Sequence, residues 1–188
     1  MGRLEKFSKL FKSKEIVTLH NRFVMLIREA RSKDVPAIQG LMNDAITNTT
    51  TNYNYKEYTG ESVLNWLHKK RVDKKPVFVY EFNHKVVAYS SFDVFRGCDA
   101  YQFSVEHSVY VHADFQGRGI GKMLLTALIE RAQKEGYHTM IAGIDASNQQ
   151  SYDFHQKLGF REAGRVREVG FKFDRWLDLI FMQLMLDR

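Results

Sequence analysis

The chain has 188 residues, of which 44% are hydrophobic, so it can bury one well-packed core and is short for two domains. Its formal net charge is +6, but residues 1–24 contribute +4 of this and leave the remainder nearly balanced. A nearly balanced body gives little support to a nucleic-acid partner, and we expect none. No run reaches the ~18 consecutive apolar residues of a membrane span, so we expect no such span. The single cysteine, Cys98, excludes an internal disulfide and is typical of a reducing compartment, which favours a cytoplasmic protein.

The leading segment, residues 1–24, differs in character from the rest of the chain. It is basic and has Leu4, Phe7, Leu10 and Phe11 at helical spacing, as in an amphipathic surface helix. The other interpretation is an extension ahead of a natural start at Met25, and we favour that one. We expect residues 25–188 to form the folded domain and residues 1–24 to be a basic extension that need not be structured.

From residue 23 onward, apolar runs alternate with amphipathic segments. Period-two and buried apolar runs predict strands at 23–30, 76–82, 85–95, 100–111, 138–144, 161–173 and 176–186. Period-3.6 patterns predict helices at 32–46, 60–72, 123–135 and 149–158. The first helix is opened by Ser32 or Asp34, and Asn83-His84 predicts a hairpin. The order predicts a mixed α/β domain with antiparallel strands first and a strand–loop–helix–strand unit in the middle.

The stretch "DFQGRGIGKMLL" (114–125) places three glycines between a predicted strand and a predicted helix. It matches neither a Walker A loop, because Gln116 stands at the first glycine position, nor a dinucleotide fingerprint, because Lys122 stands at the third. What remains is Gln116-x-x-Gly119-x-Gly121 at a helix start, where exposed N–H groups suit an anion such as a phosphate. The alternative is a plain glycine-rich turn that caps the helix.

Two signatures in order give the chain a specific family resemblance. "VYVHADFQGRGIGKMLL" resembles the acetyl-coenzyme-A signature of GNAT-type N-acetyltransferases, and "NQQSYDFHQKLGF" resembles their second signature. "REARSKDVPAI", "VEHSVYV" and "GRVREVGFKFDRWLDLIFMQL" are similar to the phosphinothricin and methionine-sulfoximine branch. The resemblance covers Leu26 to Leu186. It implies the GNAT fold, a mixed and mostly antiparallel twisted sheet flanked by helices, and a homodimer.

The resemblance implies acetyl-CoA as co-substrate and indicates which residues hold it. Main-chain amides of a splayed strand would donate hydrogen bonds to the reacting carbonyl, and the glycine loop would bind the pyrophosphate. Asn148 would bind the pantetheine arm or simply cap a helix. The implied cofactor-binding residues are Val109, Tyr110, Val111, Gln116, Gly117, Arg118, Gly119, Ile120, Gly121, Lys122 and Asn148.

Acetyl transfer to an amine needs a neutral amine, and the α-amine of a peptide has a pKa of ~7.7–8, so a general base is useful. Glu106 lies in a predicted half-buried strand and matches the position of the family's base; the alternative is a solvent-facing or ion-paired residue. His155 matches the position of the acid that protonates the leaving thiolate, and its ordinary pKa of ~6.5 suits that role. The alternative for His155 is a helix-surface histidine with no role.

Substrate candidates are Tyr53, in the polar loop after the first helix, Tyr110, and Arg96, whose guanidinium could pair with a carboxylate or phosphinate. The alternative for Arg96 is a solvated loop charge. His107 and His112 lack a ligand-spaced cluster, so we expect no metal site.

These motifs together predict an enzyme that transfers an acetyl group from acetyl-CoA to the amine of a small amino-acid-like substrate of the phosphinothricin, methionine sulfoximine or sulfone type. Cys98 lies outside the motifs, so direct transfer in a ternary complex is expected. Two alternatives stay open: an acetyltransferase for protein N-termini or polyamines, and a non-catalytic acyl-CoA-binding sensor.

Overall fold

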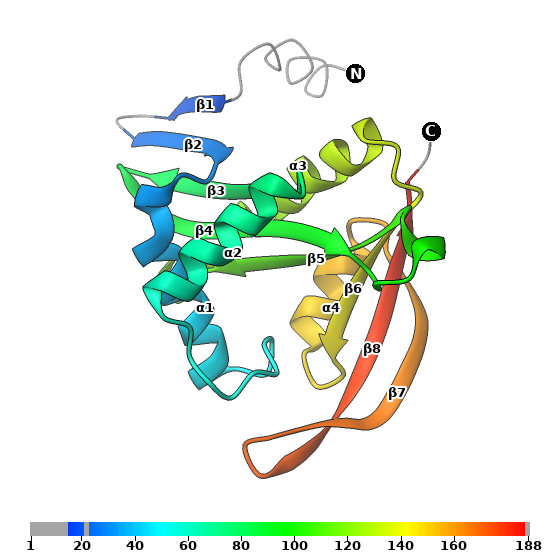
Figure 1. Ribbon diagram of the computed structural model, residues 1–188. Helices are drawn as coiled ribbons and strands as arrows, with labels where there is room; N and C mark the ends of the chain where they lie inside the picture. Colours follow the sequence, from blue (N-terminus) through cyan, green and yellow to red (C-terminus); the bar gives the residue numbers. More distant parts are fainter. Residues whose placement is uncertain (1–14, 21–22, 187–188) are drawn as a thin grey trace.

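The computed structural model describes residues 15–20 and 23–186, which form one twisted sheet with helices on both faces (Figure 1). The strands are β1 (Glu15–His20), β2 (Phe23–Glu29), β3 (Val77–Phe82), β4 (Lys85–Val94), β5 (Ser104–Val111), β6 (Thr139–Asp145), β7 (Arg161–Lys172) and β8 (Arg175–Met185). The helices are α1 (Val35–Asn48), α2 (Gly60–Val72), α3 (Ile120–Lys134) and α4 (Gln149–Gln156), with single 3₁₀ turns at Ser32–Asp34, Asp99–Tyr101 and Ala113–Phe115.

The sheet has the strand order β1-β2-β3-β4-β5-β6-β8-β7 within the described residues. Only β5 and β6 pair in parallel; every other neighbouring pair is antiparallel. Helices α1 and α2 pack with Val77, Val79 and Tyr89 on one face, while α3 packs on the other face against Tyr80 and Ala88. The expected mixed, mostly antiparallel sheet flanked by helices is confirmed.

Local signals explain most element boundaries. Asn83 and His84 both adopt positive φ (47° and 64°), the conformation of a two-residue hairpin turn whose twist matches its strands. Thr59 caps α2 by accepting a hydrogen bond from Ser62 N. Helix α3 starts at Ile120, three residues before the predicted helix, because Gly119 occupies the N-cap in the left-handed region with φ 79°. Strand β5 begins at Ser104, later than predicted, because residues 99–101 form a 3₁₀ turn.

The sequence patterns did not predict strand β1. Its residues Glu15–His20 pair antiparallel with Phe23–Arg28 of β2, so the sheet crosses the boundary expected between residues 24 and 25. The residues that carry the helical spacing of the alternative interpretation, Leu4 to Phe11, lie outside the described residues. Strand β2 pairs with β3 only from Met25 onward, through Met25–Glu29 and Phe78–Phe82. The β2–β3 pairing therefore does not depend on any residue before Met25.

We propose on this basis that a chain starting at Met25 still forms the domain. The truncation removes an edge strand and leaves the whole β2–β3 ladder intact, so we expect unchanged turnover and a small drop in melting temperature. Thermal unfolding and a turnover assay on the full and shortened chains measure this. Loss of the cooperative unfolding transition in the shortened chain would instead make residues 1–24 part of the folded unit.

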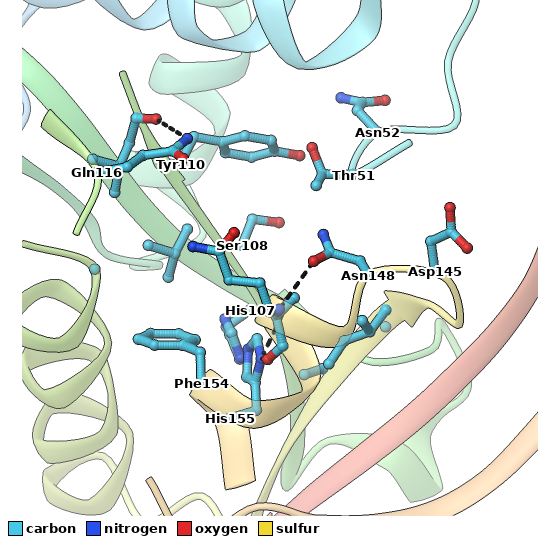
Figure 2. Close-up of a pocket in the computed structure, with 18 of the residues that line it drawn as sticks. Thr51, Asn52, His107, Ser108, Tyr110, Gln116, Asp145, Asn148, Phe154 and His155 are labelled. Carbon is cyan, nitrogen blue, oxygen red and sulfur yellow. Dashed lines mark hydrogen bonds between the residues drawn. The ribbon is translucent and has the colours of Figure 1, made fainter. Parts of the chain in front are cut away.

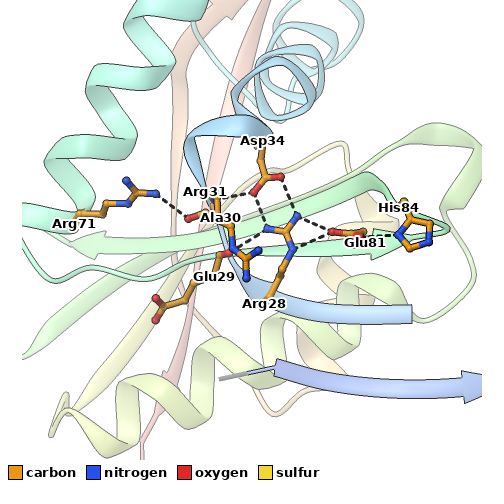
Figure 3. A network of polar contacts seen from close by, with 8 residues as sticks. All are labelled: Arg28, Glu29, Ala30, Arg31, Asp34, Arg71, Glu81 and His84. Atoms are coloured by element: carbon orange, nitrogen blue, oxygen red, sulfur yellow. Dashed lines mark hydrogen bonds and ion pairs between the residues drawn. The ribbon is translucent and has the colours of Figure 1, made fainter. Parts of the chain in front are cut away.

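A buried ion cluster joins β2 and β3 to the start of α1 (Figure 3). Arg28 is 3% exposed and donates to both carboxylate oxygens of Asp34, at 2.7 and 2.9 Å. Its Nε and Nη2 donate to Glu81 Oε2 at 2.9 and 2.6 Å, and its Nη1 donates to the Glu29 carbonyl. Asp34 also accepts from Arg31 N, which fixes the turn that leads into α1. Although burial alone would raise the pKa of Asp34, its hydrogen bonds with Arg28 and Arg31 hold that pKa below its usual value.

Candidate active site

The parallel pair at the centre of the sheet opens into a cleft. Strands β5 and β6 pair only from Ser104 to Glu106, whereas β5 continues to pair with β4 as far as Val111. The strands therefore diverge after Glu106, and residues 107–111 of β5 have no β6 neighbour. Divergence leaves main-chain groups on this edge of β5 without a strand partner, which is the arrangement that can hold a ligand carbonyl.

A cavity of about 560 Å³ occupies this opening, between the start of α3, helix α4 and the loop after α1. Figure 2 shows Phe154 and His155 on one side and Thr51 and Asn52 across from them. The lining includes polar residues from four separate segments, among them Asn52, Tyr53, Glu106, Ser108, Tyr110, Gln116, Asp145, Asn148 and His155. Within the described residues, five of the six buried side-chain polar atoms without a hydrogen-bond partner belong to this lining: Tyr53 Oη, His107 Nδ1 and Nε2, Asp145 Oδ2, which lies 3.6 Å from Arg175 Nη2, and His155 Nε2. A buried polar atom without a hydrogen bond costs free energy unless a ligand or a water molecule supplies that bond. The concentration of such atoms here therefore indicates a binding site.

The glycine loop forms one end of the cavity. Gly117 and Gly119 have φ of 72° and 79°, and a Cβ added to either would meet nothing within 4 Å. Glycine is therefore required for backbone conformation there, not because of crowding. Gly121 lies in the first turn of α3, packed near Phe154. The first N–H groups of a helix have no partner within the helix, so this end presents donors and a positive dipole to the cavity.

Side chains around the loop hold it in place. Gln116 Nε2 donates to the Val111 carbonyl at 3.2 Å, which ties the loop to the end of β5. Arg118 donates to the Asp114 carbonyl and lies over the Phe115 ring. Ile120 packs in the core beside Leu124 and also lines the cavity.

Glu106 is half-buried and projects toward Gly143 of β6. A Cβ added at Gly143 would lie 3.0 Å from Glu106 Oε1, so the glycine makes room for the carboxylate. Burial raises the pKa of Glu106, and the charge of Arg96 opposes that rise. No hydrogen bond to the carboxylate is formed within the described part of the chain. Glu106 also lines a second cavity of about 190 Å³, together with Asn52, Ser108 and Tyr110. It is therefore a carboxylate without a partner, located where two cavities meet.

His155 and His107 form a buried stacked pair, with ring centroids 5.1 Å apart and ring planes at 30°. His155 Nδ1 lies 2.7 Å from the Ser151 carbonyl, which can only accept, so Nδ1 carries the hydrogen and Nε2 carries the lone pair. Burial lowers the pKa of His155, and burial together with His155 lowers the pKa of His107 to about 3. Both rings are therefore neutral at neutral pH.

Asn148 and the two predicted substrate tyrosines also line the cavity. Asn148 caps α4, since its Oδ1 accepts from Ser151 N at 2.9 Å, which leaves its amide Nδ2 as a donor. Tyr110 stacks on Tyr89, and burial raises the pKa of Tyr110 to about 12, so its phenol stays protonated. Burial and the charge of Asp145 raise the pKa of Tyr53.

Three of the residues predicted from sequence do not line the cavity: Arg96, Arg118 and Lys122. Arg96 is exposed and lies over the Phe95 ring, and its only link to the site is its charge near Glu106. The exposed Lys122 lies on the first turn of α3, outside the cavity. The other predicted residues all line it.

Several residues of the site were not predicted from the sequence patterns, namely Thr50, Thr51, Asn52, His107, Ser108, Asp145 and Phe154. The alternation of β5 could have indicated Ser108, because Glu106, Ser108 and Tyr110 share one face of the strand. His107 is on the other face, and nothing local indicates that it stacks on a helix some fifty positions later.

Two properties of the described residues bear on other kinds of site. They contain no cluster of three or more His, Cys, Asp or Glu side chains placed to hold a metal ion. None of their helices is long and apolar enough to cross a membrane.

Residues 40–160 match the Acetyltransferase (GNAT) family. The chain is 44% identical over 163 residues to the L-amino acid N-acyltransferase MnaT of Escherichia coli (strain K12), covering 87% of this chain and 95% of that protein. It is 42% identical over 163 residues to the L-methionine sulfoximine/L-methionine sulfone acetyltransferase of Salmonella typhimurium, with the same coverage. The phosphinothricin acetyltransferase of Sinorhizobium meliloti, crystallised in complex with AcCoA, superposes with a TM-score of 0.82 at 31% identity, over 85% of this chain and 87% of that one.

Proposed function

Since the chain belongs to the acetyltransferase (GNAT) family, we propose that it transfers an acetyl group from acetyl-CoA to the amine of a small amino-acid-like substrate. The observation that carries this proposal is the position of Glu106, an unpartnered carboxylate in the same cavity as the glycine loop at the start of α3. Relatives named for L-amino acids and for methionine sulfoximine and sulfone support an amino-acid-like amine.

The residues around the cavity fit acetyl-CoA. The left-handed Gly117 and Gly119 expose main-chain N–H groups at a helix start, which suits a pyrophosphate, and Asn148 has a free amide donor for the pantetheine arm. The proposed cofactor-binding residues are Val109, Tyr110, Val111, Gln116, Gly117, Gly119, Ile120, Gly121 and Asn148, whereas Arg118 and Lys122 do not line the cavity. When bound, acetyl-CoA supplies the thioester from which the acetyl group is taken.

Glu106 acts as the general base in this proposal. Amino groups are mostly protonated at neutral pH and must lose a proton before they can attack a carbonyl. The raised pKa of Glu106 brings the carboxylate closer to the ideal for proton transfer near neutral pH. The main-chain N–H groups of Val109 and Val111, which face away from β4 past the end of the β5–β6 ladder, stabilise the negative charge that develops on the carbonyl oxygen.

His155 contributes through Nε2. Its position in the sequence predicts that it protonates the leaving thiolate, but with Nδ1 bonded to Ser151 the neutral ring has no hydrogen on Nε2. Donation would need the doubly protonated ring, which burial disfavours. An enzyme that needed this form would slow as pH rises through the lowered pKa, in conflict with the deprotonation of Glu106 and of the amine. We therefore assign His155 Nε2 as a hydrogen-bond acceptor within the site. Coenzyme A then leaves as the thiolate and takes its proton from solvent water, while Glu106 keeps the proton of the amine.

The substrate side of the cavity is formed by Tyr53, Tyr110 and the loop after α1. Arg96 contributes its positive charge near Glu106, and this charge is a long-range attraction for a substrate carboxylate or phosphinate. Direct transfer in a ternary complex follows, because Cys98 is exposed and does not line the cavity.

A thiol-release assay with acetyl-CoA tests the function. The panel comprises methionine sulfoximine, methionine sulfone, phosphinothricin, ordinary L-amino acids, a polyamine and a peptide with a free N-terminus. We expect release with the first three and with some L-amino acids. Thiol release with only the polyamine or only the peptide would show that the substrate belongs to that class and is not an amino-acid-like amine. Binding of acetyl-CoA without thiol release for any amine would indicate a sensor.

Changing Gly119 to valine should raise the Michaelis constant for acetyl-CoA about 10-fold or more. A β-branched residue cannot hold φ near 79° without strain, so the N-cap shifts and hydrogen bonds to phosphate, each worth about 1.5–3 kcal/mol, are lost. Gly136→Val is the matched control, because Gly136 has the same φ, equal free space and no place in the cavity. Equal Michaelis constants for the two variants, measured by steady-state kinetics, would remove the loop from cofactor binding.

We also propose that the protein is a cytoplasmic homodimer. Strand β7 is an edge strand within the described sheet, and its hairpin with β8 carries exposed apolar side chains, namely Val166, Val169, Phe171, Phe173 and Trp176. Edge strands with exposed apolar residues are candidates for pairing with a second copy. Light scattering distinguishes one copy of the 22.0 kDa chain from two.

A further inference from the structure

The loop that follows α1 forms the wall of the cavity opposite His155. Its residues Thr50, Thr51, Asn52 and Tyr53 line the cavity, and Figure 2 shows Thr51 and Asn52 facing the α4 side. Local hydrogen bonds join Thr49 to the Ala45 carbonyl and to Thr51 N within this segment. Contacts that other elements supply add to them on the outer side of the loop.

Lys172, at the end of β7, supplies the most buried of these contacts. The residue is 4% exposed, and its Nζ donates to the Thr49 carbonyl at 2.8 Å and to the Asn52 carbonyl at 2.6 Å. Nζ also lies 5.0 Å from the centre of the Phe173 ring. Burial lowers the pKa of Lys172, and no carboxylate among the described residues forms an ion pair with it. Burying a lysine without an ion-pair partner costs free energy. Here the hydrogen bonds that offset this cost go to two carbonyls of one loop, so the lysine holds that loop.

Neighbouring residues of β7 contact the same loop. Gly170 lies against the Tyr53 ring so closely that an added Cβ would be 2.7 Å from the ring carbon Cε2. Tyr55 donates from its hydroxyl to the Phe171 carbonyl. Three consecutive residues of β7 thus each contact the segment from Thr49 to Tyr55.

The inner side of the loop faces the two diverging strands across the cavity. Thr50 and Asn52 line that cavity together with Tyr110 of β5 and Asp145 of β6, and they lie near enough to lower the pKa of the Asp145 carboxyl and to oppose the rise that burial causes in the pKa of Tyr110. The loop therefore spans the opening between β5 and β6, and β7 holds its outer side. A shift of its outer side would change the space between Tyr53 and Glu106.

We propose that Lys172 is a positioning residue that fixes the 49–55 loop over the cavity and so sets which amines fit beside Glu106. This inference rests on the proposed function, because it concerns the amine side of that site. Lys172 touches neither substrate nor the reacting atoms; it acts through the main chain of Thr49 and Asn52. The glycine loop and Asn148, proposed to hold acetyl-CoA, are not bonded to it.

Lys172→Met tests the proposal, because methionine keeps the length and apolar stem and removes the donors. We expect kcat/KM for the best amine to fall ~10- to 100-fold, as small misplacements of a substrate commonly do, while the Michaelis constant for acetyl-CoA changes by less than ~2-fold. Arg161→Met is the matched control, since Arg161 is exposed on the same strand and lies apart from the apolar residues 166–176. We expect the control variant to have the same kcat/KM for the amine and the same Michaelis constant for acetyl-CoA as the parent.

Hydrogen exchange measured by mass spectrometry gives a readout that does not need turnover. In Lys172→Met, faster exchange should be confined to amides of residues 49–56, whereas general destabilisation would raise exchange throughout the sheet. If Lys172→Met does not fold, Gly170→Ala provides the test, because its Cβ displaces the Tyr53 ring. It should likewise lower kcat/KM for the amine while the Michaelis constant for acetyl-CoA stays nearly constant.

Folded variants with parental kinetics and parental exchange in the loop would overturn the role of Lys172. An equal rise in the Michaelis constants for the amine and for acetyl-CoA would also overturn that role. A parent enzyme that acetylates no amine of the panel would overturn the proposed function instead, while exchange in the loop would still decide whether Lys172 holds it.

Discussion

Glu106→Gln is expected to lower turnover at neutral pH about 10²-fold or more while acetyl-CoA affinity stays nearly unchanged. Glutamine keeps the shape of the side chain beside Gly143 but cannot accept a proton. The loss should shrink as pH rises, because a growing fraction of the amine then arrives already neutral. Steady-state kinetics across pH, for the parent and for the variant, measure both effects.

The stability of the same variant separates catalysis from structure. The pKa of Glu106 is raised in the folded state, so ionised Glu106 costs stability, and that cost appears as pH rises through the unfolded and then the folded pKa. The substituted glutamine carries no charge, so the melting temperature of Glu106→Gln at neutral pH should equal or exceed that of the parent. A residue kept for its reaction at a cost in stability behaves in this way.

A structural glutamate would give the reverse pattern. The variant would melt earlier, bind both substrates more weakly and show no recovery at high pH. Parental turnover across the neutral range would show that Glu106 is not the base.

Arg28→Met is expected to destabilise the protein by about 3–5 kcal/mol, the range for removing one member of a buried ion cluster. It leaves the carboxylates of Asp34 and Glu81, 4% and 13% exposed, without their shared cation. Arg131→Met is the matched control, because Arg131 forms more exposed ion pairs with Glu29 and Glu135 whose loss should cost under about 1 kcal/mol. Denaturant unfolding of the three proteins measures the difference.

The pH dependence identifies the cause of this destabilisation. In the parent the pKa of Asp34 is lowered, so its stabilising contribution is present above its unfolded pKa of ~3.9 and is lost as pH falls through the folded value. In Arg28→Met, buried Asp34 lacks that partner and binds its proton more readily. The gap in stability between parent and variant should therefore be largest at neutral pH and shrink toward pH 4. A gap that does not vary with pH would indicate lost packing instead of unpaired charge.

Features that depend on neighbouring residues could be predicted from the amino-acid sequence. Periodicity located α2 and the β3–β4 hairpin, because side-chain burial repeats along a helix or strand regardless of what lies opposite. The glycine loop could be predicted because its backbone conformation, with positive φ at Gly117 and Gly119, depends on residue type. Glu106 was singled out because it is a carboxylate in a strand predicted to be half-buried and because it matches the position of the family's base.

Other parts of the site depend on contacts between distant segments. The His107–His155 stack joins a strand to a later helix, and burial in this arrangement lowers the pKa of His155, the predicted acid. Strand β1 was missed because its apolar pattern is short, and pairing with β2 is what stabilises it. Arg96 has the residue type for substrate binding, but the loop before β5 places it outside the cavity.

The fold class, the cofactor loop and the candidate base were therefore predictable, because periodicity and residue type locate the elements and two signatures resemble those of a known family. The closure of the cavity was not, and it emerges only from the folded arrangement. Lys172 reaches carbonyls of Thr49 and Asn52 that lie 123 and 120 positions earlier, and any polar loop offers such carbonyls. Main-chain acceptors carry no sequence signature, so a contact between a buried lysine and a distant backbone becomes visible only once the sheet has brought the two segments together.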